Sequence, residues 1–146
     1  FFQNILHGLF NTLAGKTITM LGFAFKQDTG DTRDSPAIPL CEKLVGENAR
    51  VRIHDPKALE NARIELKNLK GDVSFVEDVY EAADGAHALA LVTQWDEYRE
   101  LDYEKIHQTM AEPAFIFDGR NHLDHDKLYK IGFNVFPLGK SPLKHI

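Results

Sequence analysis

Short apolar runs alternate with segments of helical periodicity along the whole chain. Apolar or alternating runs predict strands over 17–22, 50–55, 73–76, 86–92, 114–118 and 133–136. Apolar residues at helical spacing predict helices over 38–45, 57–70, 78–84, 103–110 and 124–131. The run over 86–92 is apolar at almost every position, which is typical of a central strand covered on both faces.

The alternation of strand and helix with short connections predicts an α/β fold. We therefore expect a doubly wound, mostly parallel Rossmann-like sheet of about six strands flanked by helices, with the first strand in the interior. Ligands of such sheets bind beyond the carboxyl ends of the strands. The residues that directly follow each strand are therefore the first candidates for a site.

Composition narrows the class of protein. The chain has 146 residues and a formal net charge of −5, which disfavours nucleic-acid binding because the overall field repels phosphate. The single cysteine excludes a disulfide framework and a cysteine-based zinc site. No apolar run approaches the ~18–20 residues that span a membrane, and no signal peptide is visible, so we expect a cytoplasmic protein. The chain opens at Phe1 inside a helical pattern, so we expect a piece of a longer protein.

The loop over 22–36 is the most informative stretch. A dinucleotide site needs the spacing G-x-G-x-x-G here, but only Gly22 and Gly30 are present, with two phenylalanines between them. The loop instead carries Lys26 and Arg33 just before a predicted helix N-terminus, an arrangement that suits a phosphorylated ligand. The alternative is an ordinary surface loop in which these cations pair with its three aspartates.

Arg120 is a second candidate cation, because it follows the predicted strand over 114–118. Its forked guanidinium could hold a phosphate or a ribose at the same edge of the sheet. The alternative is an ion pair with Asp118.

Several other residues have a structural interpretation. Cys41 lies on the apolar face of its helix, which predicts a buried and unreactive thiol. His122 and His125 lie among aspartates, but they lack a metal site's fixed spacing and third ligand. Asp55 precedes a proline and is expected to start a turn, and Trp95 is expected to pack at a helix start.

Four segments carry a resemblance to a known family. They read GFAFKQDTGDTRDSPAI, HDPKA, DGAHALALVTQWDEYRELDYEKIHQTM and PAFIFDGRNHLD. In this order they resemble the C-terminal domain of the UDP-glucose 6-dehydrogenases, and the resemblance covers essentially the whole chain. It implies that residues 1–12 end a central linking helix and that 13–146 form the C-terminal domain that binds the UDP-sugar.

The resemblance also implies an activity. The family oxidises UDP-glucose to UDP-glucuronate and reduces two NAD. By the matching motifs, Phe25, Lys26 and Arg120 would bind the UDP-sugar and Arg33 would reach NAD. The catalytic cysteine and most of the NAD site lie in upstream segments, so this chain would contain no catalytic residue and would oxidise nothing alone. The full enzyme would be a homo-oligomer.

Two departures and several alternatives stay open. Gln94 stands where the family more often has glutamate, and Gln27 stands where lysine is common. The related GDP-mannose and UDP-N-acetyl sugar dehydrogenases are similar. A stand-alone nucleotide-sugar-binding module or a mainly structural domain would also suit the sequence. For the leading interpretation we expect Lys26 and Arg120 to converge on one crevice, with Phe25 beside them.

Overall fold

The computed structural model describes all residues, 1–146. It contains six strands and six α-helices. The strands are β1 (Thr17–Leu21), β2 (Arg50–His54), β3 (Val73–Phe75), β4 (Ala88–Leu91), β5 (Phe115–Asp118) and β6 (Asn134–Pro137). The helices are α1 (Phe2–Gly8), α2 (Ala37–Gly46), α3 (Leu59–Glu65), α4 (Val79–Ala83), α5 (Tyr103–Thr109) and α6 (His125–Ile131), with a short 3₁₀ helix, η1 (Asp96–Arg99).

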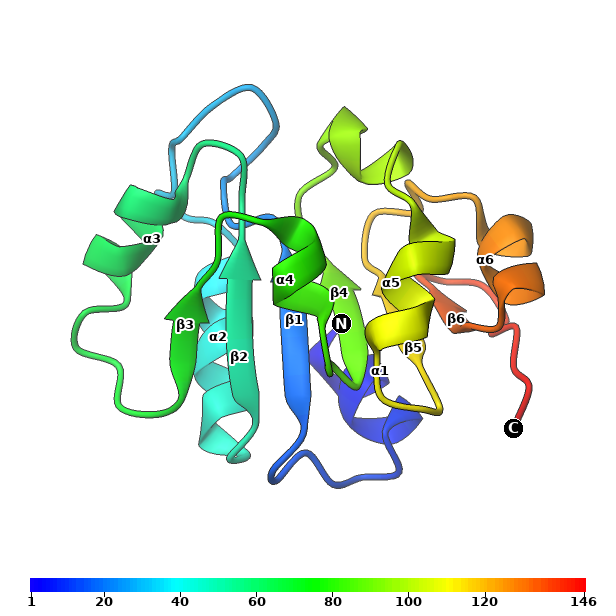
Figure 1. Cartoon of the computed structure of the whole chain (residues 1–146). Helices are drawn as coiled ribbons and strands as arrows, with labels where there is room; N and C mark the ends of the chain where they lie inside the picture. The colour runs from blue at the N-terminus through cyan, green and yellow to red at the C-terminus, as the bar shows by residue number, and fades with distance from the viewer.

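The strands form a single sheet in the order β3-β2-β1-β4-β5-β6, and every neighbouring pair is parallel. In Figure 1 the arrows of β2, β3 and β4 can be seen to point the same way. The predicted doubly wound sheet and the interior position of β1 are confirmed. Strand order reverses between β1 and β4, so the crevice that binds ligands in this class of fold is expected at their carboxyl ends.

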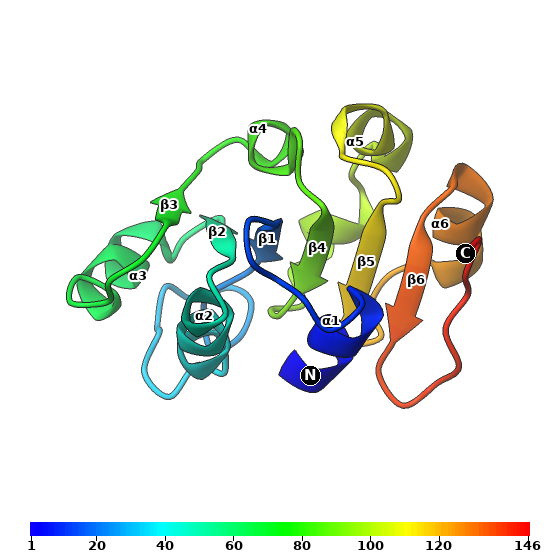
Figure 2. The same cartoon turned by 90° about the horizontal axis from the view of Figure 1, so that it is seen from below.

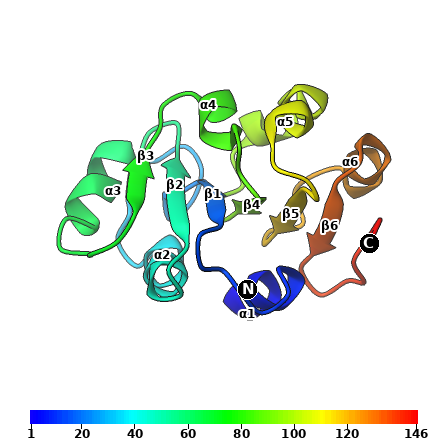
Figure 3. The ribbon, with the colours of Figure 1, turned by 60° about the horizontal axis from the view of Figure 1, so that its bottom comes forward.

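Helices cover both faces of the sheet. In Figures 2 and 3, α1 and α2 lie on one face, whereas α4, α5 and α6 lie on the other. One apolar cluster joins α1, α2 and the buried part of α3 to the sheet, and a second joins α4, α5 and α6 to it. The strand β4 is buried at every position, as its continuous apolar run predicts.

Several predicted boundaries are wrong, and the largest difference is at α3. The helix expected over 57–70 is shorter and covers Leu59–Glu65. It begins later because Asp55 holds the first residues in a turn. Beyond it, the N–H of Leu69 bonds the carbonyl of Leu66, so single turns keep both leucines inward without an α-helix. The helix α2, Ala37–Gly46, is one residue longer at each end than the predicted 38–45, and the Ser35 hydroxyl oxygen accepts the N–H of Ala37 at its start.

The first segment packs as part of the domain. Ile5, Leu9 and Leu13 are buried in the same cluster as the sheet. That residues 1–12 also end a longer helix stays a prediction. None of the helices has the length and apolar character that crossing a membrane requires.

Candidate functional site

The loops after β1, β4 and β5 meet at the carboxyl edge of the sheet. These three strands are neighbours, with β4 in the middle. The long loop over 22–36 projects beyond the arrowhead of β1 in Figure 1. This edge contains every residue that the sequence predicts as a ligand contact.

The turn after β1 is closed by direct contact with the segment after β4. Gly22 has φ +97°, and a Cβ built on it would lie 2.4 Å from the Cβ of Thr93. The Thr93 hydroxyl donates to the carbonyl oxygen of Ala24 at 2.7 Å. Glycine is therefore required both by the backbone conformation and by the close approach of Thr93.

Asp55, at the end of β2, anchors this loop from the other side. It is 3% exposed, and its Oδ2 accepts the N–H groups of Phe23 at 2.8 Å and Ala24 at 2.9 Å. Its Oδ1 accepts those of Lys57 and Ala58 at 2.8 and 2.9 Å, which confirms the predicted turn. Sequence reasoning missed the bonds to the loop, since their donors are distant along the chain.

The anchored turn does not fit the pyrophosphate of a dinucleotide. In a Rossmann site the N–H groups after the first strand face the phosphates. Here Asp55 accepts the N–H groups of Phe23 and Ala24, and the Phe23 carbonyl accepts the Ser35 hydroxyl at 2.7 Å. The indole of Trp95 donates to the same Asp55 oxygen at 3.2 Å, as part of the buried packing that the sequence predicts for it.

The tip of the loop is exposed and carries the candidate ligand residues. Phe25 is 51% exposed, and Lys26 is exposed and forms no ion pair. Arg33 instead pairs with Asp31, with 2.9 Å between Nη2 and Oδ2, and the side chain stays 85% exposed. The hydrogen bond from Arg33 lowers the pKa of Asp31 to about 2. The ordinary ion-pair interpretation therefore describes Arg33, whereas Lys26 has its ammonium free.

A second buried carboxylate, Asp118, shapes the loop that carries Arg120. Its Oδ1 accepts the backbone N–H of Arg120 at 3.1 Å. Its Oδ2 accepts the N–H of His122 at 2.8 Å, the N–H of Leu123 at 2.9 Å and the Nε2 of His125 at 2.8 Å. The Arg120 side chain forms no ion pair with Asp118 and lies exposed. Both histidines thus have hydrogen-bonding roles in this loop.

A cavity of about 260 Å³ lies beside Arg120. Its lining comes from the start of α1, from α2 and from the ends of β4 and β5: Phe1, Phe2, Pro36, Pro39, Leu40, Lys43, Leu91, Val92, Gly119, Arg120 and Leu138. Phe25 and Lys26 do not line it. Lys26 and Arg120 share an edge but follow strands separated by β4, whose presence sets the ends of β1 and β5 roughly 10 Å apart at ~4.8 Å per strand. Their convergence on one ligand stays a prediction.

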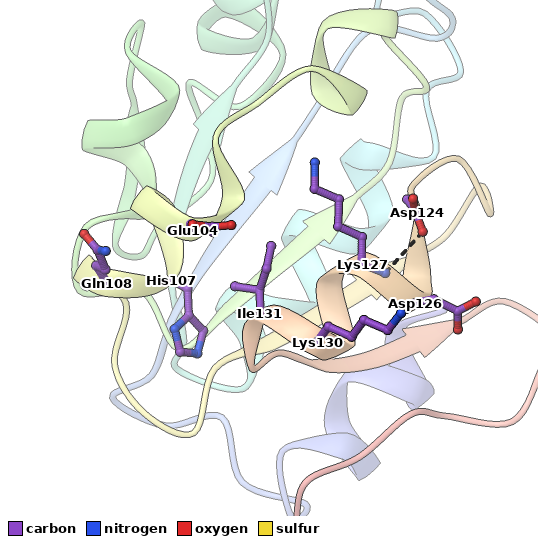
Figure 4. Close-up of a pocket in the computed structure, with 8 residues that line it drawn as sticks. All are labelled: Glu104, His107, Gln108, Asp124, Asp126, Lys127, Lys130 and Ile131. Carbon is purple, nitrogen blue, oxygen red and sulfur yellow. Dashed lines mark hydrogen bonds between the residues drawn. The ribbon is translucent and has the colours of Figure 1, made fainter.

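Two other features lie apart from this edge. Cys41 is buried on α2, and burial raises the pKa of its thiol to about 12, as expected for an unreactive core residue. A larger cavity, about 750 Å³, runs between α5 and α6 and is lined mostly by charged side chains of both signs (Figure 4). None of the four predicted ligand residues lines it.

Comparison with known proteins identifies the family. The sequence profile of the UDP-glucose/GDP-mannose dehydrogenase family, UDP binding domain, matches residues 19–125. The chain belongs to the UDP-glucose/GDP-mannose dehydrogenase family. The match spans most of the chain, and it contains Phe25, Lys26, Arg33 and Arg120. The expectation from the resemblance is thus confirmed at the level of family and domain.

Relatives of known name support this family assignment. UDP-glucose 6-dehydrogenase 2 of Oryza sativa is 46% identical over 163 aligned positions, which cover 99% of this chain and 34% of the rice protein. UDP-glucose 6-dehydrogenase 1 of Arabidopsis thaliana is 42% identical and is covered to 33%. The structure of a UDP-glucose dehydrogenase from Pyrobaculum islandicum superposes with a TM-score of 0.73 at 29% identity, covering 93% of this chain and 28% of that one. The chain therefore spans about a third of the length of the curated relatives it matches.

Proposed function

We propose that this chain is the part of an NAD-dependent UDP-glucose 6-dehydrogenase that binds the UDP portion of UDP-glucose, through Phe25, Lys26 and Arg120. The observation that carries the proposal is the pair of cations, Lys26 and Arg120, exposed and free of ion pairs on anchored loops at the carboxyl edge of a UDP-binding domain. Relatives that are 42–46% identical over nearly the whole chain are named UDP-glucose 6-dehydrogenases, which favours glucose over the other sugars of the family.

The chemistry of the three residues suits a nucleoside diphosphate. A lysine ammonium acts as a point charge on phosphate, whereas the arginine fork can donate two parallel hydrogen bonds. Phe25 offers a half-exposed aromatic face next to Lys26. Each charge-assisted contact is worth about 1.5–3 kcal/mol, which corresponds to roughly a ten- to hundredfold change in affinity.

Titration of the 146-residue chain with UDP, followed by calorimetry, tests the proposal. The wild-type chain should bind, and Lys26→Ala and Arg120→Ala should each raise the dissociation constant roughly ten- to hundredfold. Lys70→Ala is the matched control, because Lys70 is an exposed lysine outside these loops and should bind UDP like the wild type. Absence of binding, or equal affinity in all four proteins, would refute the proposal and leave a structural role for the domain.

Arg33 is the one residue of this chain that we propose to contact the cofactor, NAD. Because the turn after β1 does not fit a pyrophosphate, the longer protein would hold NAD elsewhere, with the exposed Arg33 reaching toward it. In that protein, Arg33→Ala should weaken NAD use more than UDP-glucose binding. An effect confined to UDP-glucose would contradict this assignment.

The chain alone should not catalyse the oxidation. The reaction needs a bound hydride acceptor and a reactive nucleophile, and the only thiol here is buried with a strongly raised pKa. Incubation of the chain with UDP-glucose and NAD should give no reduced cofactor above background. Turnover that is lost in Cys41→Ser would overturn both the proposal and the structural interpretation of Cys41.

A further inference from the structure

A continuous series of hydrogen bonds joins the loop of Lys26 to the loop of Arg120. We propose that four side chains, here called the linking residues, fix the positions of the two cations relative to each other: Asp55, Trp95, His122 and Asp118. They are positioning residues, because they act on the ligand only through Lys26 and Arg120. The inference rests on the proposed function, which makes these two cations the ligand contacts.

The first half of the connection runs from Lys26 to Trp95. Asp55 Oδ2 accepts the N–H of Ala24, two residues before Lys26, at 2.9 Å. The same oxygen accepts the indole N–H of Trp95, the residue that ends the loop after β4, at 3.2 Å. Asp55 and Trp95 are 3% and 6% exposed, so water competes little for these bonds.

The second half runs from Trp95 to Arg120. The Trp95 carbonyl oxygen lies 2.9 Å from His122 Nε2. A carbonyl oxygen can only accept, so Nε2 of His122 carries the proton and donates. The backbone N–H of His122 then bonds Asp118 Oδ2, and Asp118 Oδ1 accepts the N–H of Arg120. The loop after β4 thereby connects the two loops that carry the cations.

The loop after β4 lies between the two loops that carry the cations, and it offers no charged side chain to a ligand. Its part in the series of hydrogen bonds that joins those two loops explains why it is tightly bonded. The two cations lie on loops that follow strands two spacings apart, and they can hold one ligand with little ordering cost only if these loops keep a fixed separation. Gln27 adds a further tie, since its Oε1 accepts the N–H of Asp96 at 3.0 Å. Because that tie is exposed, we expect the linking residues to dominate, since Asp55, Trp95 and Asp118 are buried and His122 is half-buried.

The inference is tested by variants that remove one donor and keep an aromatic side chain. Trp95→Phe removes the indole N–H, and His122→Phe removes the Nε2 donor. Each should raise the dissociation constant for UDP about five- to tenfold. His122→Gln restores an N–H donor near the Trp95 carbonyl and should recover most of the affinity.

The matched control is Thr19→Val in the middle of β1. Thr19 is fully buried, and its hydroxyl donates to the carbonyl of Ala82, away from the carboxyl edge. This variant loses one buried hydrogen bond, so its unfolding midpoint should fall, but its affinity for UDP should match the wild type. If Trp95→Phe and His122→Phe lower the midpoint in the same way and also keep full affinity, the residues are only structural and the inference is wrong.

A measurement without ligand separates this inference from the proposed function. Compared with the wild type, amide hydrogen exchange should be faster at Arg120 in Trp95→Phe and at Ala24 in His122→Phe. In each case the substitution lies at one part of the hydrogen-bond series and the affected amide lies in the loop at its far end. Thr19→Val should leave both rates at their wild-type values. Unchanged exchange at both amides would overturn the inference even if UDP binds. Conversely, a wild-type chain that does not bind UDP would refute the proposed function, while the exchange rates still decide whether the two loops are linked.

Discussion

Replacement of Asp55 by asparagine should destabilise the domain more than any other change of one atom at the carboxyl edge. Asp55 accepts five N–H groups, three on Oδ2 and two on Oδ1. An asparagine offers one carbonyl oxygen and one NH₂ group, which can only donate. In whichever orientation the amide lies, at least two N–H donors, at least one of them buried, then face the NH₂ group.

The magnitude follows from that count. An unsatisfied buried donor costs about 1–3 kcal/mol and one or two such donors are left, so Asp55→Asn should lose about 1–6 kcal/mol. Domains are typically stable by only about 5–15 kcal/mol, so the variant should be folded but marginal. The loop that carries Lys26 should also lose order, because two of the five donors belong to its first residues, Phe23 and Ala24.

Urea unfolding at pH 7 measures this loss. The matched control is Asp72→Asn, because Asp72 is an exposed aspartate that pairs with Arg50 at 3.6 Å on the surface. That pair should contribute less than about 1 kcal/mol. If Asp55→Asn loses less than about 1 kcal/mol, the buried carboxylate is not the anchor of the loop and the reasoning is refuted.

Three further predictions concern the core and the turn. Gly22→Ala should destabilise by more than about 3 kcal/mol, because it adds a clash with Thr93 to the cost of positive φ, whereas Gly15→Ala, with open space around it, should lose only about 1–2 kcal/mol in the same urea assay. Cys41, whose pKa is raised to about 12, should react with a thiol reagent at pH 8 only when the chain unfolds, and rapid labelling of the native protein would contradict its burial. Burial lowers the pKa of His54 below 6.5, so the unfolded chain takes up a proton first, and stability should fall by up to about 1.4 kcal/mol per pH unit as pH drops below about 6.5. His54→Gln should flatten this slope, and an equally steep slope in the variant would assign the effect to another group.

The hydrophobic pattern predicts the sheet well because the signal is local. Each strand is a short apolar or alternating run, and the continuous apolar run over 86–92 already indicates that β4 is central. The length of α3 could not be predicted, since Leu66 and Leu69 keep an inward face in single turns after the helix has ended. Periodicity reports which side chains are buried and cannot distinguish an α-helix from successive turns with the same face.

The same distinction between local and distant interactions separates the site features that the sequence predicts from those that it does not. The position of Lys26 and Arg120 after strands is readable from the sequence, because parallel strands place such residues at one edge. For Asp55, the bonds to Lys57 and Ala58 are local, so the sequence predicts the turn that they form. The bonds to Phe23 and Trp95 span 32 and 40 positions, so no spacing rule could reveal them.

The acidic composition of the chain poses a physical question, because a domain of net charge −5 is proposed to bind a diphosphate. The carboxylates at the ends of β2 and β5 answer it. Asp55 accepts five hydrogen bonds and Asp118 accepts four, so N–H dipoles surround their charge and screen it from a ligand. Lys26 and Arg120 form no ion pairs, so their charges stay available to an anionic ligand although the domain as a whole is acidic. If the proposed function holds, the local pairing of these side chains matters more for diphosphate binding than the net charge of the domain.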